Sequence, residues 1–386
     1  GCAAWNCLYL PSTKKNFPLF PAEFILDGKD QIRGWFNLLM VSSMIALGKP
    51  SFKNCYMHGF VQDALGRKMS KSLGNVISPA EVIDEYGADT FRYYALGSCP
   101  PATDLRYNFD DIKLKHKNLL VLWNLHKYVI DLSTTLGTAP QDIDEKLVKN
   151  VFGLEEKYIL SKLHTAIAKT TTAFNQYLLN DVPWIAEDLY LELSRTYIQL
   201  VRDKASVGED AEKQAVLLVL SDVLLGCLKL LAPVVPFACE AMYQNLRSAF
   251  GVAWSKEESI HHYAWPVADK KLIDVALGEQ MITSKTIIQS ILAAREKAGL
   301  GVRWPVAGVS VVSSQQDVRE AGAALHSLIK QHANVKLLSF SDHLPGAKVK
   351  VKGDYKKLGP VFGNRAAEII AKLSIDSPES ILSHLE

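Results

Sequence analysis

Two lysines and two serines lie close together in the stretch GRKMSKSLGNVISP, residues 66–79. Lys68 and Lys71 are three residues apart, Ser70 and Ser72 alternate with them, and glycines flank the group. Such a loop can bring two ammonium groups and hydroxyl donors to a polyphosphate, where negative charge develops as a phosphoryl bond breaks. It is not a P-loop, because the order GxxxxGK[ST] is absent. The alternative is a solvated basic hairpin tip, the commoner explanation for an isolated KxxK pair.

Short apolar strands alternate with helical patterns over residues 1 to about 100, which predicts an α/β layer around this loop. Strand composition occurs at 22–26 and 55–61, a turn signal at 27–30, and helical spacing at 31–47. We therefore expect two strands that flank a helix, ahead of the loop.

A helix start follows the loop directly. Ser78 as N-cap, Pro79 at the first helical position and Glu81 two residues further predict a complete capping box. Gly87 marks the predicted end of this helix.

Long helical patterns occupy the chain from about 105 to 250. One apolar stripe has spacings of three, four and seven residues, and consists of Leu160, Leu163, Ile167, Phe174 and Leu178. Further helices are predicted over 181–204 and 215–231, with the polar loop 205–213 between them. The apolar run 215–237 contains Asp222 and Lys229 and ends among prolines, so it predicts a buried bundle helix rather than a membrane span.

Mixed α/β patterns return after a boundary near 267–275. A long helix is predicted to reach about Ala298, with Gly299 as its end. Beyond it the patterns predict a strand over 306–312, a helix over 319–332, an alternating strand over 347–353 and a helix over 364–373.

Composition bounds the possible classes of protein. The chain has 386 residues, 48% of them hydrophobic, and a formal net charge of +2. These values describe a globular protein of two or three domains, in which any nucleic-acid contact must come from local patches. Six scattered cysteines include no CxxC pair, so neither a zinc site nor a disulfide framework is indicated, and a reducing cytosol is the expected compartment.

The loop and its flanks resemble the signature region of a known enzyme class. KMSKS, with HGFVQDALGRK before it and LGNVISP after it, is similar to the signature loop of class I aminoacyl-tRNA synthetases. LDGKDQIRGWF, residues 26–36, resembles the adenylate-pocket segment of the isoleucyl type, whose Arg-Gly-Trp-Phe ending separates it from valyl and leucyl relatives. SRTYIQLVRDK and LAPVVPFACEAMYQNL resemble that family's anticodon-binding bundle. GVRWPV and YKKLGPVFG resemble the C-terminal region of its archaeal and eukaryotic-type members, so the resemblance covers nearly the whole chain.

The resemblance implies a nucleotide site at the carboxyl end of a sheet strand, where open α/β folds place ligands. The residues that it assigns to the adenylate pocket are Asp27, Gly28, Asp30 and Gln31. A carboxylate there can hold the substrate ammonium or the ribose hydroxyls, and Gly28 lets the backbone approach the nucleotide. The family usually has Glu at the position of Asp27, so the reach of this side chain is one methylene shorter.

The resemblance also places ATP contacts on the next strand and on the loop. These are His58, Gly59, Ser70 and Ser72. Without the neighbouring signature, a lone histidine such as His58 would be interpreted as a core residue. Lys71 is expected to stabilise pyrophosphate as the amino-acid carboxylate attacks the α-phosphorus of ATP, and Lys68 is the second candidate for this role.

Basic residues near aromatic side chains in the helical segment are candidates for tRNA binding. They are Lys113, Lys117, Trp123, Arg195 and Arg202. Such side chains contact phosphates and stack on unpaired bases. For each of them the alternative is a tryptophan in the core or a solvated charge. KVKVK, residues 348–352, is interpreted as a half-buried strand with outward lysines.

Two elements of the family are absent from this sequence. No His-x-Gly-His element occurs, and there is no room for the large inserted domain that edits mischarged valine. The chain also opens on Gly1 rather than on methionine. We therefore expect the C-terminal part of a longer synthetase, which alone would not activate an amino acid.

The resemblance implies a cytoplasmic, monomeric parent enzyme that uses isoleucine, ATP with Mg²⁺, and tRNA(Ile), without protein-bound zinc. It predicts three domains: part of a Rossmann-like α/β catalytic domain over 1–104, an all-α anticodon-binding bundle over 105–268, and a small α/β domain over 269–386. One alternative is a valyl- or leucyl-type synthetase, against which DQIRGWF argues. The other is a non-catalytic tRNA-binding module, against which the intact KMSKS argues.

Overall fold

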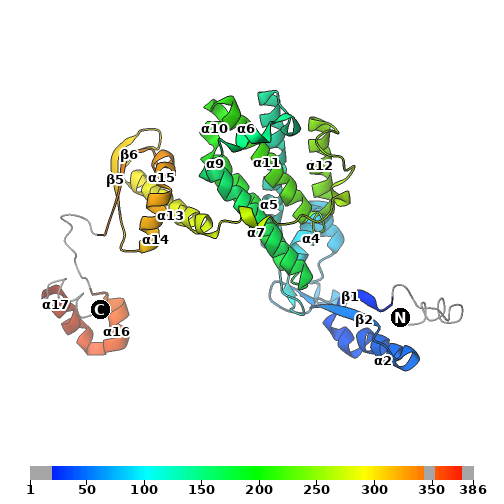
Figure 1. The fold of residues 1–386 in the computed structure, drawn as a ribbon. Helices are drawn as coiled ribbons and strands as arrows, with labels where there is room; N and C mark the ends of the chain where they lie inside the picture. Colours follow the sequence, from blue (N-terminus) through cyan, green and yellow to red (C-terminus); the bar gives the residue numbers. More distant parts are fainter. Residues whose placement is uncertain (1–19, 343–352, 376–386) are drawn as a thin grey trace. The chain divides into compact units, whose positions relative to one another are not determined.

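The computed structural model describes residues 20–342 and 353–375, which form two compact units divided between Gly278 and Glu279 (Figure 1). Both units are rich in helices, and the strands of the described residues form three parallel pairs. These pairs are β1 (Ala22–Gly28) with β2 (Phe52–His58), β3 (Val61–Gln62) with β4 (Leu105–Arg106), and β5 (Val306–Val312) with β6 (Val335–Ser341).

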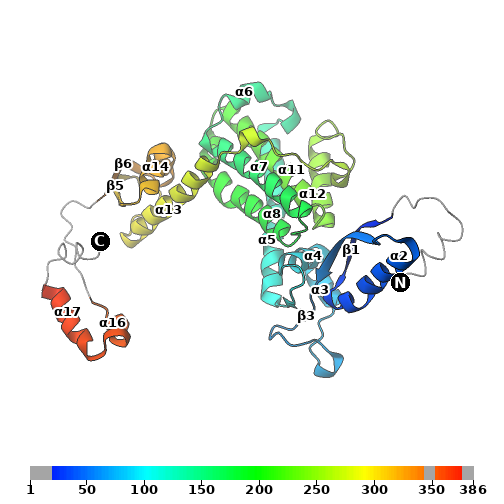
Figure 2. The same cartoon turned by 60° about the horizontal axis from the view of Figure 1, so that its bottom comes forward.

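The first unit begins with an α/β layer, in which α2 (Trp35–Leu47) runs alongside β1 and β2 (Figure 2). The strand predicted over 22–26 is confirmed and extends to Gly28. The predicted turn is instead a 3-10 helix (Lys29–Arg33). The strand predicted over 55–61 is divided, since β2 ends at His58 and β3 begins at Val61.

The helix after the signature loop, α3 (Pro79–Tyr86), has its predicted limits. Ser78 is the N-cap residue, and Gly87 ends the helix with φ +84°. The predicted capping box is wrong, because the Ser78 side chain makes no capping hydrogen bond. Pro79 has no N–H group, so this helix start has one donor fewer to satisfy. The next helix, α4 (Ala88–Gly97), follows immediately.

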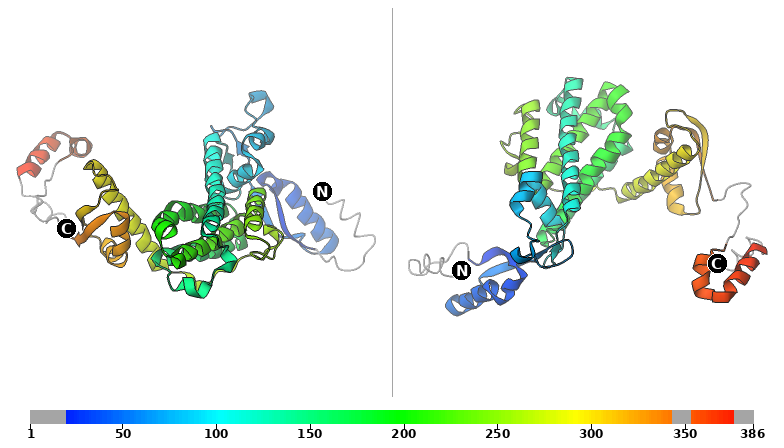
Figure 3. Two further views of the ribbon diagram at one scale, coloured as in Figure 1. Left: turned by 90° about the horizontal axis from the view of Figure 1, so that it is seen from above. Right: turned by 180° about the vertical axis from the view of Figure 1, so that it is seen from behind.

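The rest of the first unit is a helical bundle. Its helices are α5 (Phe109–Leu136), α6 (Glu145–Lys149), α7 (Leu154–Asn175), α8 (Asp181–Glu192), α9 (Ile198–Leu200), α10 (Arg202–Val207), α11 (Asp210–Leu231) and α12 (Pro236–Phe250). Short 3-10 turns occur at Pro140–Asp142, Ile260–His262 and Lys270–Leu272. Helices α5, α8 and α11 pack against one another in this bundle, which Figure 3 shows from two further sides.

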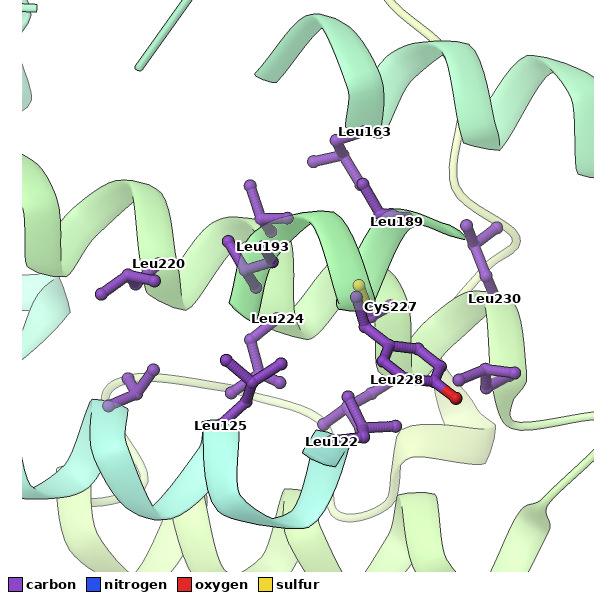
Figure 4. Close-up of a cluster of buried hydrophobic side chains, with 14 of the residues drawn as sticks. Leu122, Leu125, Leu163, Leu189, Leu193, Leu220, Leu224, Cys227, Leu228 and Leu230 are labelled. Atoms are coloured by element: carbon purple, nitrogen blue, oxygen red, sulfur yellow. The ribbon is translucent and has the colours of Figure 1, made fainter. Parts of the chain in front are cut away.

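Helix α11 is the centre of the bundle core. Of its 22 residues, 14 are buried. Figure 4 shows leucines from α5, α7, α8 and α11 turned toward one another in this core. By length and composition α11 is a candidate to cross a membrane, but 78% of its apolar window is buried inside the protein. The prediction of a buried bundle helix is therefore confirmed.

Two expectations for the bundle are wrong in detail. Leu178 lies beyond the end of α7 and is 39% exposed, so it does not extend the buried stripe. The helix predicted over 181–204 is interrupted by a π-helical turn (Leu193–Tyr197), in which Thr196 and Tyr197 are both buried. A π turn adds a residue to the helical repeat, which lets neighbouring positions face inward together. The predicted polar loop shrinks to Gly208 and Glu209.

Helix α13 (Val275–Lys297) begins at the end of the first unit and continues into the second. It ends next to Ala298 as predicted, and Gly299 follows with φ +70°. The predicted strand 306–312 is confirmed as β5. Two helices, α14 (Gln316–Ala324) and α15 (His326–His332), connect it to β6. The helix predicted over 319–332 is thus divided at Leu325, whose side chain is buried.

Two elements of the second unit were not predicted, namely β6 and α16 (Tyr355–Phe362). The helix expected over 364–373 is confirmed from Ala366 onward as α17 (Ala366–Ile375), which follows a 3-10 turn (Gly363–Arg365) and packs against α16. The strand predicted over 347–353, with the KVKVK segment, lies outside the described residues apart from its last position.

Candidate active site

The carboxyl ends of β1 and β2 carry most of the residues that the sequence assigns to the nucleotide. The register of this parallel pair sets Gly28 opposite His58. The Asp27 carboxylate accepts a hydrogen bond from the Gly28 N–H at 2.7 Å. A side chain on Gly28 would come within 2.6 Å of the Asp30 carboxylate and 3.6 Å of the His58 ring. A side chain at position 28 would therefore displace the Asp30 carboxylate, and the structure brings Asp27, Gly28, Asp30 and His58 to one edge of the sheet.

Gln31 has a structural role that the sequence did not reveal. Its side-chain oxygen accepts a hydrogen bond from the Trp35 N–H at the start of α2, at 2.9 Å. Its amide nitrogen donates to Asp30 at 2.9 Å. Both ends of this side chain are thus engaged within the protein, and its contact with a nucleotide stays a prediction.

The backbone at Gly59 lies directly against a neighbouring segment. A Cβ atom at this position would overlap the carbonyl oxygen of Thr103. The exposed ring of His58 turns back over the same turn, with Nδ1 2.8 Å from the Gly59 carbonyl oxygen. Glycine is therefore required at 59 for packing between two backbone segments.

Asp104 ties this turn to the 3-10 helix after β1. Its carboxylate accepts hydrogen bonds from Lys29 at 2.6 Å and from the Phe60 N–H at 2.8 Å. These bonds, with that from Lys29 first, lower the pKa of Asp104. The charged carboxylate thereby holds together three segments that are distant in the sequence.

The signature loop is a short hairpin. Gln62 pairs with Lys68 in an antiparallel bridge, and the Asp63 N–H donates to the Arg67 carbonyl at 3.0 Å. Gly66 lies at the turn with φ +76°. Lys68 is exposed, as is the neighbouring Lys71, and neither ammonium forms an ion pair with a described residue. Two positive charges are therefore presented to solvent without internal neutralisation.

The serines of the loop build its second half. Ser70 is the N-cap of a 3-10 helix (Lys71–Leu73), and its Oγ accepts a hydrogen bond from the Leu73 N–H at 3.3 Å. The Ser72 Oγ lies 3.2 Å from the Ser70 Oγ. Between the two lysines, Met69 packs against a small core of Val82, Tyr94, Tyr107 and Ile112. The loop is thus anchored by its methionine.

Two residues that the sequence analysis did not single out hold this loop. The Asp63 carboxylate accepts hydrogen bonds from the Leu65 and Arg67 N–H groups, from the Arg67 guanidinium and from the Asn75 amide. The hydrogen bond from Asn75 is the largest of the causes that lower the pKa of Asp63 to about 2. A turn pattern, Asp followed by Ala-Leu-Gly, was the available signal for Asp63. The part played by Asn75 depends on a contact that spacing alone does not predict.

The candidate tRNA contacts lie on several helices of the bundle. Lys113 and Lys117 are exposed one turn apart on α5, Arg195 is exposed in the π-helical turn, and Arg202 is exposed at the start of α10. Trp123 is half-buried and packs edge-on against a histidine ring 4.5 Å away, so part of it belongs to the core. The role of all five in RNA binding stays a prediction.

Lys115, which lies among these basic residues in the sequence, is buried instead. Its ammonium forms an ion pair with Glu187 at 2.9 Å and lies 3.5 Å from the centroid of the Trp184 ring. The Tyr93 hydroxyl donates to the same carboxylate at 2.7 Å. This lysine therefore joins α5 to α8 inside the protein and is not available to a polyanion.

Two family models match this chain. The first, tRNA synthetases class I (I, L, M and V), matches residues 2–108, which include the strand ends and the signature loop. The second, the anticodon-binding domain of tRNA ligase, matches residues 156–312. Together they account for the order of an α/β layer followed by a helical bundle.

Curated relatives match along nearly the entire chain. The isoleucine–tRNA ligase of Methanosarcina barkeri is 36% identical over 377 residues, which are 96% of this chain and 35% of that protein. That of Methanothermobacter thermautotrophicus is 34% identical over 363 residues, 93% of this chain and 34% of that protein. The chain thus spans about a third of the length of the relatives it matches.

Solved structures share the fold at lower identity. A LeuRS from Agrobacterium radiobacter K84, in a ternary complex with tRNA and LeuAMS, has a TM-score of 0.52 and 21% identity, over 70% of this chain and 32% of that one. Methionyl-tRNA synthetase of Mycobacterium tuberculosis, with methionyl-adenylate, has a TM-score of 0.51 and 20% identity, over 61% of this chain and 47% of that one. The chain therefore contains a class I tRNA synthetase domain followed by an anticodon-binding domain of tRNA ligases, and the relatives that it matches are isoleucine–tRNA ligases.

Proposed function

We propose that the protein containing this chain is an isoleucine–tRNA ligase. A carboxylate oxygen of isoleucine attacks the α-phosphorus of ATP, and pyrophosphate leaves. A hydroxyl of the terminal tRNA ribose then attacks the carbonyl carbon of the adenylate, and AMP leaves. The names of the relatives, at 36% identity and below over nearly all of this chain, support the choice of isoleucine.

The observation that carries the proposal is the pair of exposed ammonium groups on an anchored hairpin that follows the carboxyl end of β2 in the chain. Lys71 is the proposed stabiliser of the leaving pyrophosphate, and Lys68 assists it. Neither has a carboxylate partner among the described residues, so both charges are available to phosphate oxygens.

The proposed adenylate pocket lies at the edge of β1 and β2. Gly28 has no side chain, so a ligand can approach its backbone at this edge. Asp27 and Asp30 supply acceptors for an ammonium or for ribose hydroxyls. The remaining proposed contacts are Gln31, Gly59, Ser70 and Ser72.

Mg²⁺ would arrive with ATP as part of the substrate. Among residues 20–342 and 353–375, no cluster of three or more His, Cys, Asp or Glu side chains could hold a metal ion. The oxygen ligands that Mg²⁺ prefers are present on the phosphates of ATP itself. Its chemistry would be to neutralise phosphate charge beside Lys68 and Lys71.

We further propose tRNA(Ile) as the RNA substrate and the domain limits 1–104, 105–268 and 269–386, with the first a part of a Rossmann-like catalytic domain. The match of residues 156–312 to an anticodon-binding domain supports a role of the bundle in tRNA recognition. The exposed side chains of Lys113, Lys117, Arg195 and Arg202 are the proposed contacts, with the exposed edge of Trp123 available for stacking. A cytoplasmic, monomeric enzyme is the corresponding proposal for location and assembly.

Isoleucine-dependent exchange of labelled pyrophosphate into ATP tests this proposal in the full gene product. Isoleucine, valine and leucine are compared, because one methylene contributes only about 1–3 kcal/mol of discrimination. Lys71→Ala should lower the exchange rate by about 10²- to 10³-fold, as for the loss of one transition-state donor. Lys53→Ala is the matched control, since Lys53 is an exposed lysine of the same layer that pairs with Glu23.

Each outcome of the exchange experiment decides between functions. Isoleucine-dependent exchange that collapses in Lys71→Ala and survives in Lys53→Ala supports the proposal. Faster exchange with valine or leucine would identify that amino acid, instead of isoleucine, as the substrate. A folded protein that binds tRNA but exchanges with none of the three would be a non-catalytic tRNA-binding module.

A further inference from the structure

The two ends of the signature loop are joined by a pair of side chains. Asp63 precedes the loop and Asn75 follows it, and the Asn75 Nδ2 donates to the Asp63 Oδ2 at 3.0 Å. Twelve residues separate the pair in sequence. This contact closes the segment that contains both lysines and both serines into a ring.

Asn75 holds the backbone on both sides of Met69. Its Nδ2 donates to the Lys68 carbonyl oxygen at 3.2 Å, and its Oδ1 accepts a hydrogen bond from the Ser70 N–H at 2.9 Å. One amide side chain therefore fixes the residue before Met69 and the residue after it. An asparagine suits this position because it offers a donor and an acceptor on the same planar group.

Asp63 holds the hairpin tip in the same way. Its Oδ1 accepts hydrogen bonds from the Leu65 N–H at 3.0 Å and the Arg67 N–H at 2.8 Å, and its Oδ2 accepts from the Arg67 Nε at 2.8 Å. With Asn75, this carboxylate collects four donors. A carboxylate with this number of hydrogen bonds stays ionised through the neutral and mildly acidic range.

The two lysines gain a defined direction from this arrangement. Lys68 and Lys71 leave the backbone on either side of the pinned segment, and Met69 between them is packed into the small core. A charged side chain acts on a transition state only when it is held in position, and a displacement of about 1 Å can lower a rate by about 10²-fold. We propose that Asp63 and Asn75 are positioning residues for the adenylation step, acting through Lys68 and Lys71; this inference rests on the proposed function.

Asn75→Asp is the variant that tests this proposal. The change keeps the acceptor for the Ser70 N–H, removes the donors to Lys68 and Asp63, and places a second carboxylate against Asp63. We expect kcat/KM for ATP in pyrophosphate exchange to fall by about 10- to 100-fold. The KM for isoleucine should stay within about twofold, because the amino acid lies outside the reach of the loop in this proposal. A smaller fraction of folded protein would lower kcat and leave both KM values unchanged, so a rise in the KM for ATP alone distinguishes the positioning role.

A double variant in which the residue types at positions 63 and 75 are swapped supplies a second, independent test. In the double variant Asp63→Asn with Asn75→Asp, the amide of residue 63 can again donate to the carboxylate of residue 75, which removes the repulsion of two carboxylates. The double variant should therefore recover part of the activity lost by Asn75→Asp alone. Asn54→Asp is the matched control: Asn54 also donates its amide to a backbone carbonyl in the layer, that of Glu23 at 2.9 Å, and should leave exchange unchanged.

The outcomes separate this inference from the proposed function. If the wild-type protein shows no exchange with any of the three amino acids, the proposed function fails first. If it shows exchange and Asn75→Asp retains wild-type kcat/KM for ATP, the positioning role is overturned. A double variant no more active than Asn75→Asp would likewise overturn it, as would equal rises in the KM for ATP and the KM for isoleucine. A lower kcat with a rise in KM confined to ATP, and partial recovery in the double variant, supports it.

Discussion

The helical bundle and the α/β layer use apolar residues in opposite ways. In α11 nearly two thirds of the residues are buried, 14 of 22. In α2 only Phe36, Leu39 and Ser43 are buried, while Leu38 is 62% exposed and Ile45 is 82% exposed. The sequence of α2 is apolar on all sides, which is typical of a helix covered all round. The described residues of the layer cover only one side of it.

The two regions are therefore stabilised by different interactions. Removal of apolar surface from water, at about 25 cal/mol per Å², dominates in the bundle. The layer depends more on polar side chains that join distant segments, namely Asp63, Asn75 and Asp104. Substitutions of these polar residues should therefore disturb the loops of the candidate site. Substitutions of buried apolar residues should disturb the bundle.

An ion pair from each region gives the largest expected contrast. Lys115→Met leaves Glu187 buried without its cation, which should lower the free energy of unfolding by about 3–5 kcal/mol. Lys53→Met removes an exposed partner of Glu23 and should change it by about 1 kcal/mol or less. Urea denaturation followed by circular dichroism measures both. Equal effects would contradict the different stabilisation of the two regions.

Truncation of one apolar side chain in each region should also give different effects. Leu224→Ala creates a cavity in the bundle core, where Leu224 is fully buried, and should lower the free energy of unfolding by about 2–5 kcal/mol. Ile45→Ala removes an exposed side chain from α2 and should change it by about 0.5 kcal/mol or less. The difference in urea midpoint between the two variants is the measurement. A loss of more than about 2 kcal/mol in Ile45→Ala would show that α2 is covered in solution.

Asp63 and Asp89 should give folding stability opposite pH dependences, which are the smallest of the expected effects. Hydrogen bonds, first that of Asn75, lower the pKa of Asp63 to about 2, so its contribution is complete above the ordinary value of 3.8 and is lost as pH falls toward 2. Burial raises the pKa of Asp89, although its Oδ2 accepts a hydrogen bond from Ala238 N–H at 2.5 Å. Protonation of Asp89 therefore favours the folded state as pH falls from neutrality toward 3.8.

Urea unfolding between pH 7 and 2 separates the two groups. The stability difference between wild type and Asp63→Asn should be constant down to about pH 5 and shrink below about pH 4. The difference between wild type and Asp89→Asn should shift in favour of the wild type as pH falls from 7 to 4. A shift of the same sign for both variants would reject the assignment of hydrogen bonding to one carboxylate and burial to the other.

Local signals in the sequence predicted the elements whose limits are set by local chemistry. Ser78, Pro79 and Gly87 fix the ends of α3, and Gly299 follows the end of α13. The apolar run of α11 predicted its burial correctly. Each of these depends on backbone preferences or on composition within one segment.

Tertiary contacts decided what the sequence could not predict. The break at Leu325 and the π-helical turn before Ile198 each let particular side chains reach a core whose position the sequence does not contain. At the site, Gln31 caps α2 and Asn75 binds Asp63 through side-chain hydrogen bonds that leave no periodic pattern. The motif residues could thus be located from sequence, whereas the residues that hold them could not.

The close packing at Gly59 also yields a rule for comparing sequences. Any side chain there would overlap the Thr103 carbonyl oxygen, and because the obstacle is backbone, no substitution at position 103 can remove it. A homologue with a residue other than glycine at position 59 should therefore have a different 100–104 connection, through an insertion, a deletion or a changed turn. Position 59 and the length of that connection should therefore covary across an alignment of relatives.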